Sequence, residues 1–390
     1  MNRNIFLLSI CQALGMAAAP MIVLVGGIIG SDLAPSASLS TLPLAIMVVG
    51  GALFSLPAAL LMGKVGRRYG FMTGSALALA ASLLAIQAII TMNFYLFCLA
   101  TLGIGGNMAF IQQYRFAAAE SVTPERVGRA ISMVLVGGIM AALIGPELAK
   151  HSRDWLPLGP YSGSFASLAA IYVINIVLLS FLSVTMKENA VVTGIKRPFA
   201  QMAFQPLFLT AVLAGLVAYS VMTFIMTATP ISMHIIDGFS LDDTAWVVEC
   251  HVMAMFIPSL FSGFLIDRFG IGKIMITGIL LMTLCVLVAL YNQHLIHYWG
   301  GLVLLGIGWN FLFVGGTALL TRSYLPNERF RAQAVNDFTV YSFQAAASLS
   351  AGAVIYLVGW KTLNLISLPL LMLMLIIVFR ANPSQPITEK

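Results

Sequence analysis

The sequence predicts an all-α membrane protein with twelve transmembrane helices, and its composition and its apolar segments carry that prediction. Of the 390 residues, 60% are hydrophobic and only 9% are charged, whereas a soluble globular chain has about 25% charged residues. With 20 basic and 14 acidic side chains, the chain cannot coat two or three soluble domains of this total length. A soluble enzyme, a nucleic-acid-binding domain and a disordered scaffold are therefore excluded.

The apolar segments come at the spacing of membrane-spanning helices. One crossing needs about 20 mostly apolar residues, and a chain of this length holds about a dozen helices with their loops. Several segments contain Gly or Pro, which neighbouring helices in a bundle tolerate. The twelve segments are centred near Met16, Phe54, Ala80, Gly106, Gly138, Ile174, Ser220, Met255, Leu280, Phe311, Ala346 and Leu370.

The basic residues predict the orientation of these helices. Among the 20 Lys and Arg residues, only Lys150, Arg153 and Lys361 fall on one side of the predicted membrane. Cytoplasmic loops carry the excess of Lys and Arg, so we expect a multi-pass protein of the inner (plasma) membrane with both termini in the cytoplasm. The net charge of +6 then reflects topology and does not indicate a nucleic-acid partner.

The two halves of the chain repeat each other. Gly63–Gly70 (GKVGRRYG) recurs 200 residues later as Gly263–Gly270 (GFLIDRFG). Gly103–Asn107 (GIGGN) recurs 203 residues later as Gly306–Asn310 (GIGWN). A third match, again 203 residues apart, joins Glu125-Arg126 to Glu328-Arg329.

This repeat divides the chain into two six-helix bundles. We expect an N-terminal bundle at 1–186, a basic cytoplasmic linker at 187–205 and a C-terminal bundle at 206–390. Six helices return the chain to the same face, so the halves are parallel, as in secondary transporters that rock two bundles around a midplane site. The sequence contains no GxxxxGK[ST] motif. We therefore expect a transporter that uses no ATP. We also expect a monomer in the lipid bilayer that is not an enzyme and has no permanent cofactor.

These features resemble the major facilitator superfamily over the whole chain. Gly263–Gly270 is similar to the loop signature G-x-L-x-D-R-x-G of that family. The resemblance implies the major facilitator fold and transport by alternating access. In the N-terminal copy of the loop, Arg67 stands where the family usually has Asp, so Asp267 is the intact copy. In the family, this Asp is thought to hold the two halves together on the cytoplasmic side.

Few charged side chains fall within the predicted helices, and those that do are functional candidates because charge is costly in a bilayer. The first segment has no carboxylate, which counts against a cationic-drug exporter of this family. Structural explanations compete with function. The helix dipole would stabilise Asp337 in the first turn of a helix. The long side chain of Arg115 would let its charge reach the cytoplasm by snorkelling. An interfacial pair with Lys150 would explain Glu147. The candidates for coupling or gating are Glu249, Glu147, Asp337, Arg115 and Asp267.

The seventh and eighth segments carry two pairs of soft-metal ligands at helical spacing. Met222 and Met226 share a helical face, and so do His251 and Met255. Pro230 cannot donate to the carbonyl of Met226, so we expect a kink at the methionine pair. Thioether and imidazole ligands suit Cu(I), whereas thioethers are poor ligands for Mg²⁺ or Mn²⁺. Spacing alone thus indicates a soft-metal site, although methionine is also common apolar filler.

The same constellation resembles the copper-importing branch of the superfamily, which is associated with the assembly of cbb3-type cytochrome oxidase. That branch is marked by MxxxM on helix seven and HxxxM on helix eight. The resemblance implies that the chain imports copper across a bacterial inner membrane. Met233 and His234 would form an entry station for the metal.

Two other functions stay open at this point. One is a proton-coupled transporter of a small organic compound, and the other is a membrane copper sensor that does not transport. The cavity of an organic-compound transporter would be lined by Asn107, Phe110, Gln113, Trp309, Asn310, Phe313 and Tyr341.

Overall fold

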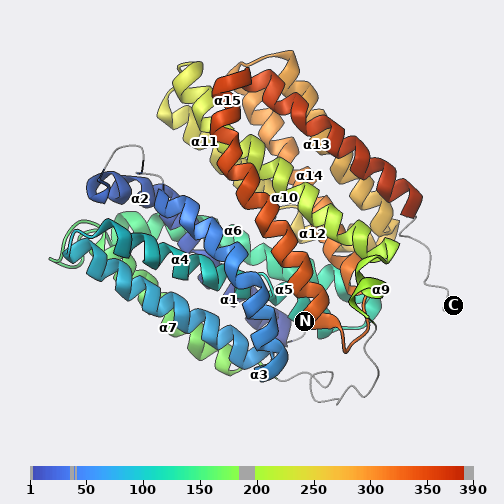
Figure 1. Cartoon of the computed structure of the whole chain (residues 1–390), viewed down its shortest axis with the longest axis horizontal. Helices are drawn as coiled ribbons and strands as arrows, with labels where there is room; N and C mark the ends of the chain where they lie inside the picture. The colour runs from blue at the N-terminus through green and yellow to red at the C-terminus, as the bar shows by residue number, and fades with distance from the viewer. Residues whose placement is uncertain (1–2, 36–38, 40–41, 184–197, 382–390) are drawn as a thin grey trace. The chain divides into compact units, whose positions relative to one another are not determined.

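The computed structural model describes residues 3–35, 39, 42–183 and 198–381. Within these ranges the regular structure is entirely helical, without a β-strand, which confirms the predicted fold class. Figure 1 shows the long helices of the two parts of the chain.

The helices of the N-terminal half follow the predicted apolar segments. For example, α4 begins where the side chain of Asn93 accepts a hydrogen bond from the backbone N–H of Leu96 (3.0 Å), which is the usual N-cap arrangement. The elements are α1 (Arg3–Met16), α2 (Ala18–Leu33), α3 (Leu42–Ile90), α4 (Phe94–Ile111), α5 (Tyr114–Glu120), η2 (Pro124–Arg126), α6 (Val127–His151) and α7 (Ser162–Ser180).

The C-terminal half is built in the same way. Ser240 caps α11 by accepting from the backbone N–H of Asp243 (3.0 Å). The elements are α9 (Phe199–Ala203), α10 (Pro206–Pro230), the π-helix η3 (Ile231–Ile236), α11 (Leu241–Phe256), α12 (Ser259–Phe269), α13 (Ile271–Tyr291), α14 (Leu295–Thr321) and α15 (Arg329–Ala381).

The described helices supply enough crossings for the predicted topology. Nine are long and apolar enough to span a membrane, or ten if α11 and α12 form one bent span. Two of them, α3 with 49 residues and α15 with 53, are interrupted by Gly66 and Gly359 at positive φ. Each would be roughly 70–80 Å long if straight, more than twice the hydrocarbon core. Figure 1 shows the two parts of α15 running in different directions. Counting α3 and α15 as two crossings each gives twelve in the described chain.

The chain divides into two compact units. The N-terminal unit comprises Met1–Val122, Met133–Thr193 and Gln333–Tyr341, and the C-terminal unit comprises Thr123–Ser132, Gly194–Ala332 and Ser342–Lys390. A short part of α15 therefore belongs to the N-terminal unit. Most of the predicted linker at 187–205 lies outside the described residues, so the predicted domain boundaries stay a prediction.

The repeated GIG-x-N segments explain how helices pack inside each unit. A Cβ atom on Gly105 would lie 1.9 Å from the carbonyl oxygen of Met47, so α4 approaches α3 too closely for any larger residue. A Cβ on the equivalent Gly308 would lie 2.6 Å from a side chain of α13. Asn107 and Asn310, which end the two segments, are buried. The segments thus serve close helix packing in both halves.

Candidate functional site

Two groups of buried side chains are candidates for function, one in each unit. We call the first the charge cluster; it lies in the N-terminal unit and consists of Arg67, Gln113, Arg115, Glu120, Gln333 and Asp337. We call the second the aromatic cluster; it lies in the C-terminal unit and consists of Tyr219, Phe256, Trp309 and Phe313.

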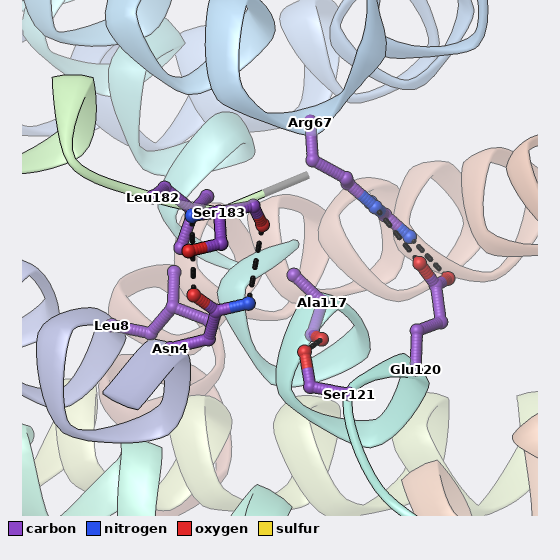
Figure 2. A pocket seen from close by; sticks show the side chains of 8 residues that line it. All are labelled: Asn4, Leu8, Arg67, Ala117, Glu120, Ser121, Leu182 and Ser183. Atoms are coloured by element: carbon purple, nitrogen blue, oxygen red, sulfur yellow. Dashed lines mark hydrogen bonds and ion pairs between the residues drawn. The ribbon is translucent and has the colours of Figure 1, made fainter. Parts of the chain in front are cut away.

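Arg67 is the centre of one half of the charge cluster. Its guanidinium is 3% exposed and forms an ion pair with Glu120 (Nη2 to Oε1, 2.7 Å). Two glutamines accept its other hydrogen bonds, Gln113 at 2.8 Å and Gln333 at 2.6 Å. An arginine cannot lose its proton in a protein, so its burial depends on these partners. Figure 2 shows Arg67 reaching the Glu120 carboxylate.

Asp337 is the centre of the other half of the charge cluster. Its side chain is 1% exposed and pairs with Arg115 (Oδ1 to Nη2, 2.7 Å). Gln113 donates to Asp337 (2.5 Å) while it accepts from Arg67, so one amide joins the two ion pairs. Asn336 also donates to Asp337 (2.9 Å). The cluster is therefore one connected network.

This geometry corrects two structural explanations of the sequence. Arg115 does not snorkel, because its side chain is 3% exposed and bound to Asp337. Asp337 is not a first-turn carboxylate, because α15 begins more than two turns earlier, at Arg329. Glu120 and Gln333 were missed, since a lone polar residue near a helix end is indistinguishable in sequence from a solvated one. The available signal was Arg67 itself, which stands where the family usually has Asp.

A small pocket adjoins the charge cluster (Figure 2). Its volume is about 10 Å³, which is the space of about one water molecule. Across it Asn4 donates to the backbone carbonyl of Ser183 (3.1 Å). The pocket is too small for an organic substrate. Its lining residues are Asn4, Leu8, Arg67, Ala117, Glu120, Ser121, Leu182 and Ser183.

The aromatic cluster brings together three helices of the C-terminal unit. Trp309 and Phe313 of α14 lie nearly parallel, with ring centroids 4.9 Å apart. Tyr219 of α10 meets both rings edge-on, at 5.2 and 5.1 Å. Phe256 of α11 approaches Trp309 edge-on at 6.0 Å. The four rings are buried, and the sequence pointed only to the two on α14.

Several buried polar atoms on residues of the aromatic cluster or on their neighbours in sequence have no hydrogen-bond partner among the described residues. They include the indole N–H of Trp309 and the hydroxyl of Ser220. Asn310 donates to the carbonyl of Met255 (2.7 Å) and to the hydroxyl of Ser259 (2.6 Å), but its own oxygen has no partner. Most buried polar atoms in proteins are paired, so these atoms are candidates for contact with a ligand.

The predicted copper ligands are buried to different degrees. His251 is fully buried, Met222 and Met255 are nearly so, and Met226 is only half-buried. Nδ1 of His251 lies 2.8 Å from the carbonyl oxygen of Leu302 on α14, and the Met255 carbonyl also bonds to α14. Whether the four residues share one metal stays a prediction.

The other predictions for the seventh and eighth segments have mixed outcomes. α10 stays α-helical to Pro230 and the π-helix η3 follows it, so the kink expected at Met226 stays a prediction. Met233 is fully buried whereas His234 is exposed and bonds to a nearby backbone carbonyl. The two therefore face different surroundings, which does not favour an entry station. Glu249 is exposed, so it points away from buried His251, as predicted.

The remaining predicted residues take part in two ion pairs that are exposed or partly exposed, or, for Tyr341, are buried. Glu147 pairs with His151 (3.1 Å), and both are exposed; the side chain of Lys150 lies outside the described residues, so the pair with Lys150 stays a prediction. Asp267 pairs with Arg129 (2.6 Å). Tyr341 is buried in the N-terminal unit, where its ring packs near Gly51.

The family model described as Major Facilitator Superfamily matches residues 5–241 and 207–390. The riboflavin transporter RfnT of Brucella anthropi is 39% identical over 391 residues, covering 100% of this chain and 98% of the relative. The uncharacterized MFS-type transporter YddS of Bacillus subtilis is 28% identical over 91% of this chain and 85% of its own length.

Solved structures agree in fold. The transporter FucP in the outward conformation matches with a TM-score of 0.77 at 16% identity, over 98% of this chain and 99% of that one. A bacterial homologue of the iron transporter ferroportin, in the outward-facing state, matches with a TM-score of 0.74 at 14% identity, over 98% of this chain and all of that one.

Proposed function

The chain belongs to the Major Facilitator Superfamily and is a multi-pass secondary transporter, and from this premise we propose that it carries riboflavin or a close flavin relative by alternating access. One observation carries the proposal: the 39% identity to a riboflavin transporter extends over 100% of this chain. Similarity over both halves includes all the helices that could contact a substrate. This substrate corresponds to the organic-compound alternative and not to the copper hypothesis.

We assign proton coupling to Asp337 of the charge cluster. Its carboxylate is almost fully buried and touches Arg115, Gln113 and Asn336. Protonation of Asp337 would release the charge of Arg115, which would then need a new partner. Such a change in a buried network biases one packing arrangement against another. The expected setting is the inner membrane, with a monomer whose termini both face the cytoplasm.

Uptake of labelled riboflavin tests the proposed function. Tritiated riboflavin is supplied to a bacterial strain that lacks its own riboflavin synthesis and uptake and expresses the chain or an empty vector. We expect saturable uptake that unlabelled riboflavin competes away. Uptake equal to the vector control, with the protein present in the membrane, would overturn the proposal.

Copper import stays the second candidate, and one observation favours it. A carbonyl oxygen only accepts, so Nδ1 of His251 donates to Leu302 and leaves Nε2 as a buried acceptor without a partner among the described residues. Metal-binding histidines usually donate their other ring N–H in this way. Uptake of radioactive copper by wild type, Met226→Ala and His251→Ala tests this candidate. Copper uptake that falls in both variants would support it, and uptake no greater than the vector control would reject it.

A further inference from the structure

We infer that the aromatic cluster is the subsite for the flat ring of the substrate, with Phe313 supplying a stacking face and Trp309 a hydrogen-bond donor at the ring edge. The identity of the ring as a flavin rests on the proposed function. The location and the residues rest on the structure of the C-terminal unit.

The arrangement of the rings is the first support. Tyr219 stands edge-on to Trp309 and to Phe313, with interplanar angles of 82° and 83°. Trp309 and Phe313 are themselves only 19° from parallel. A flat conjugated ring that displaced Tyr219 and stacked on Phe313 would therefore lie nearly parallel to Trp309, whose in-plane N–H could meet the edge of that ring. Stacked and edge-to-face aromatic pairs are both favourable, so the ring would replace the contacts that Tyr219 makes.

The unpaired polar atoms are the second support. Trp309 is 1% exposed, yet its indole N–H has no partner among the described residues. A buried tryptophan N–H usually finds one. The flavin ring carries carbonyl acceptors and one N–H donor on the same edge. The N–H of Trp309 matches such a carbonyl, and the unpaired oxygen of neighbouring Asn310 matches the ring N–H.

A second aromatic pair in the same unit provides a matched control. Trp246 and Trp299 are stacked with centroids 6.0 Å apart and planes 8° from parallel. Trp246 is 46% exposed, which suits an aromatic side chain at the membrane surface. The Trp246–Trp299 pair and the Trp309–Phe313 pair are thus both stacked, and stacking alone does not distinguish them. Burial together with unpaired polar atoms distinguishes the cluster around Trp309.

Riboflavin fluorescence tests the assignment directly, because an indole in contact with a flavin quenches the flavin emission. The full-length protein is purified in lipid nanodiscs, and riboflavin binding is measured both by quenching and by equilibrium binding of tritiated riboflavin. For Trp309→Phe we expect roughly five- to tenfold weaker binding and loss of most quenching. Phe313→Leu should also weaken binding, and Trp299→Phe should leave both signals unchanged.

Lumichrome, which has the flavin ring without the ribityl chain, separates ring binding from chain binding. We expect lumichrome to compete with riboflavin for the wild type and to compete less well for Trp309→Phe. If the wild type binds riboflavin while Trp309→Phe and Phe313→Leu bind and quench like the wild type, the inference is wrong and the proposed function stands. If the wild type binds lumichrome at Trp309 but does not take up riboflavin, the ring subsite stands and the proposed function fails.

Discussion

Arg67 and Asp267 occupy equivalent positions of the internal repeat but carry opposite charges. Arg67 is 3% exposed and pairs with Glu120. Asp267 is 20% exposed and pairs with Arg129, which is 53% exposed. Both halves therefore have an ion pair near this position, but the residue at the equivalent position is the cation in one half and the anion in the other. The difference in burial decides how much each pair contributes, since a buried charge without its partner is costly and an exposed one is not.

The largest effect is expected for Arg67→Met, which removes the positive charge and leaves Glu120 and both glutamines without it. Breaking a buried pair in this way costs about 3–5 kcal/mol. We expect a correspondingly lower unfolding temperature, measured by fluorescence-detected size-exclusion after heating. Arg268→Met, one residue beyond the equivalent position, is the exposed control. Equal stability of the two variants would contradict a structural role of the charge cluster.

Asp337→Asn tests the coupling half of the same network. The amide keeps a hydrogen-bonding side chain beside Arg115 but cannot be protonated and released. We expect riboflavin accumulation against a gradient to be abolished, while exchange between labelled and unlabelled riboflavin continues in proteoliposomes. Asp267→Asn serves as the matched variant. Accumulation that still responds to an imposed pH gradient in Asp337→Asn would place coupling elsewhere.

The equivalent glycines of the repeat extend the comparison to helix packing. In Gly105→Ala the new Cβ would meet a backbone oxygen at 1.9 Å, whereas in Gly308→Ala it would meet a flexible methionine side chain at 2.6 Å and a backbone oxygen at 2.7 Å. Overpacking costs about 1–3 kcal/mol or more when the neighbour cannot move. We expect Gly105→Ala to lower the unfolding temperature more than Gly308→Ala. The reverse order would show that α3 yields more readily than α13.

The smallest effect is expected for Asp267→Asn. Its pair with Arg129 is partly solvated, and such pairs contribute about 0–1 kcal/mol. Unfolding temperature and membrane level should stay close to those of the wild type. A fall in unfolding temperature as large as that of Arg67→Met would show that the family-like copy of the loop has a role beyond this ion pair.

The polar side chains show where prediction from sequence reached its limit. Arg115 and Asp337 were singled out because charge is costly in a membrane and Gln113 as a residue that lines a cavity, and the structure joins the three. Their structural alternatives failed because snorkelling and helix-dipole arguments consider one helix at a time. Tyr219 was missed because one tyrosine in an apolar segment carries no periodic signal.

The sequence by itself determined that this is a helical membrane protein with twelve crossings in two related halves. Hydropathy and repetition are local and periodic properties, so they can be counted without knowing which helices touch. Only the tertiary structure decided which polar groups meet. Arg67 and Gln333 are 266 residues apart, and Tyr219 and Trp309 come from different helices. Burial makes such partners necessary, but packing of the whole unit selects them.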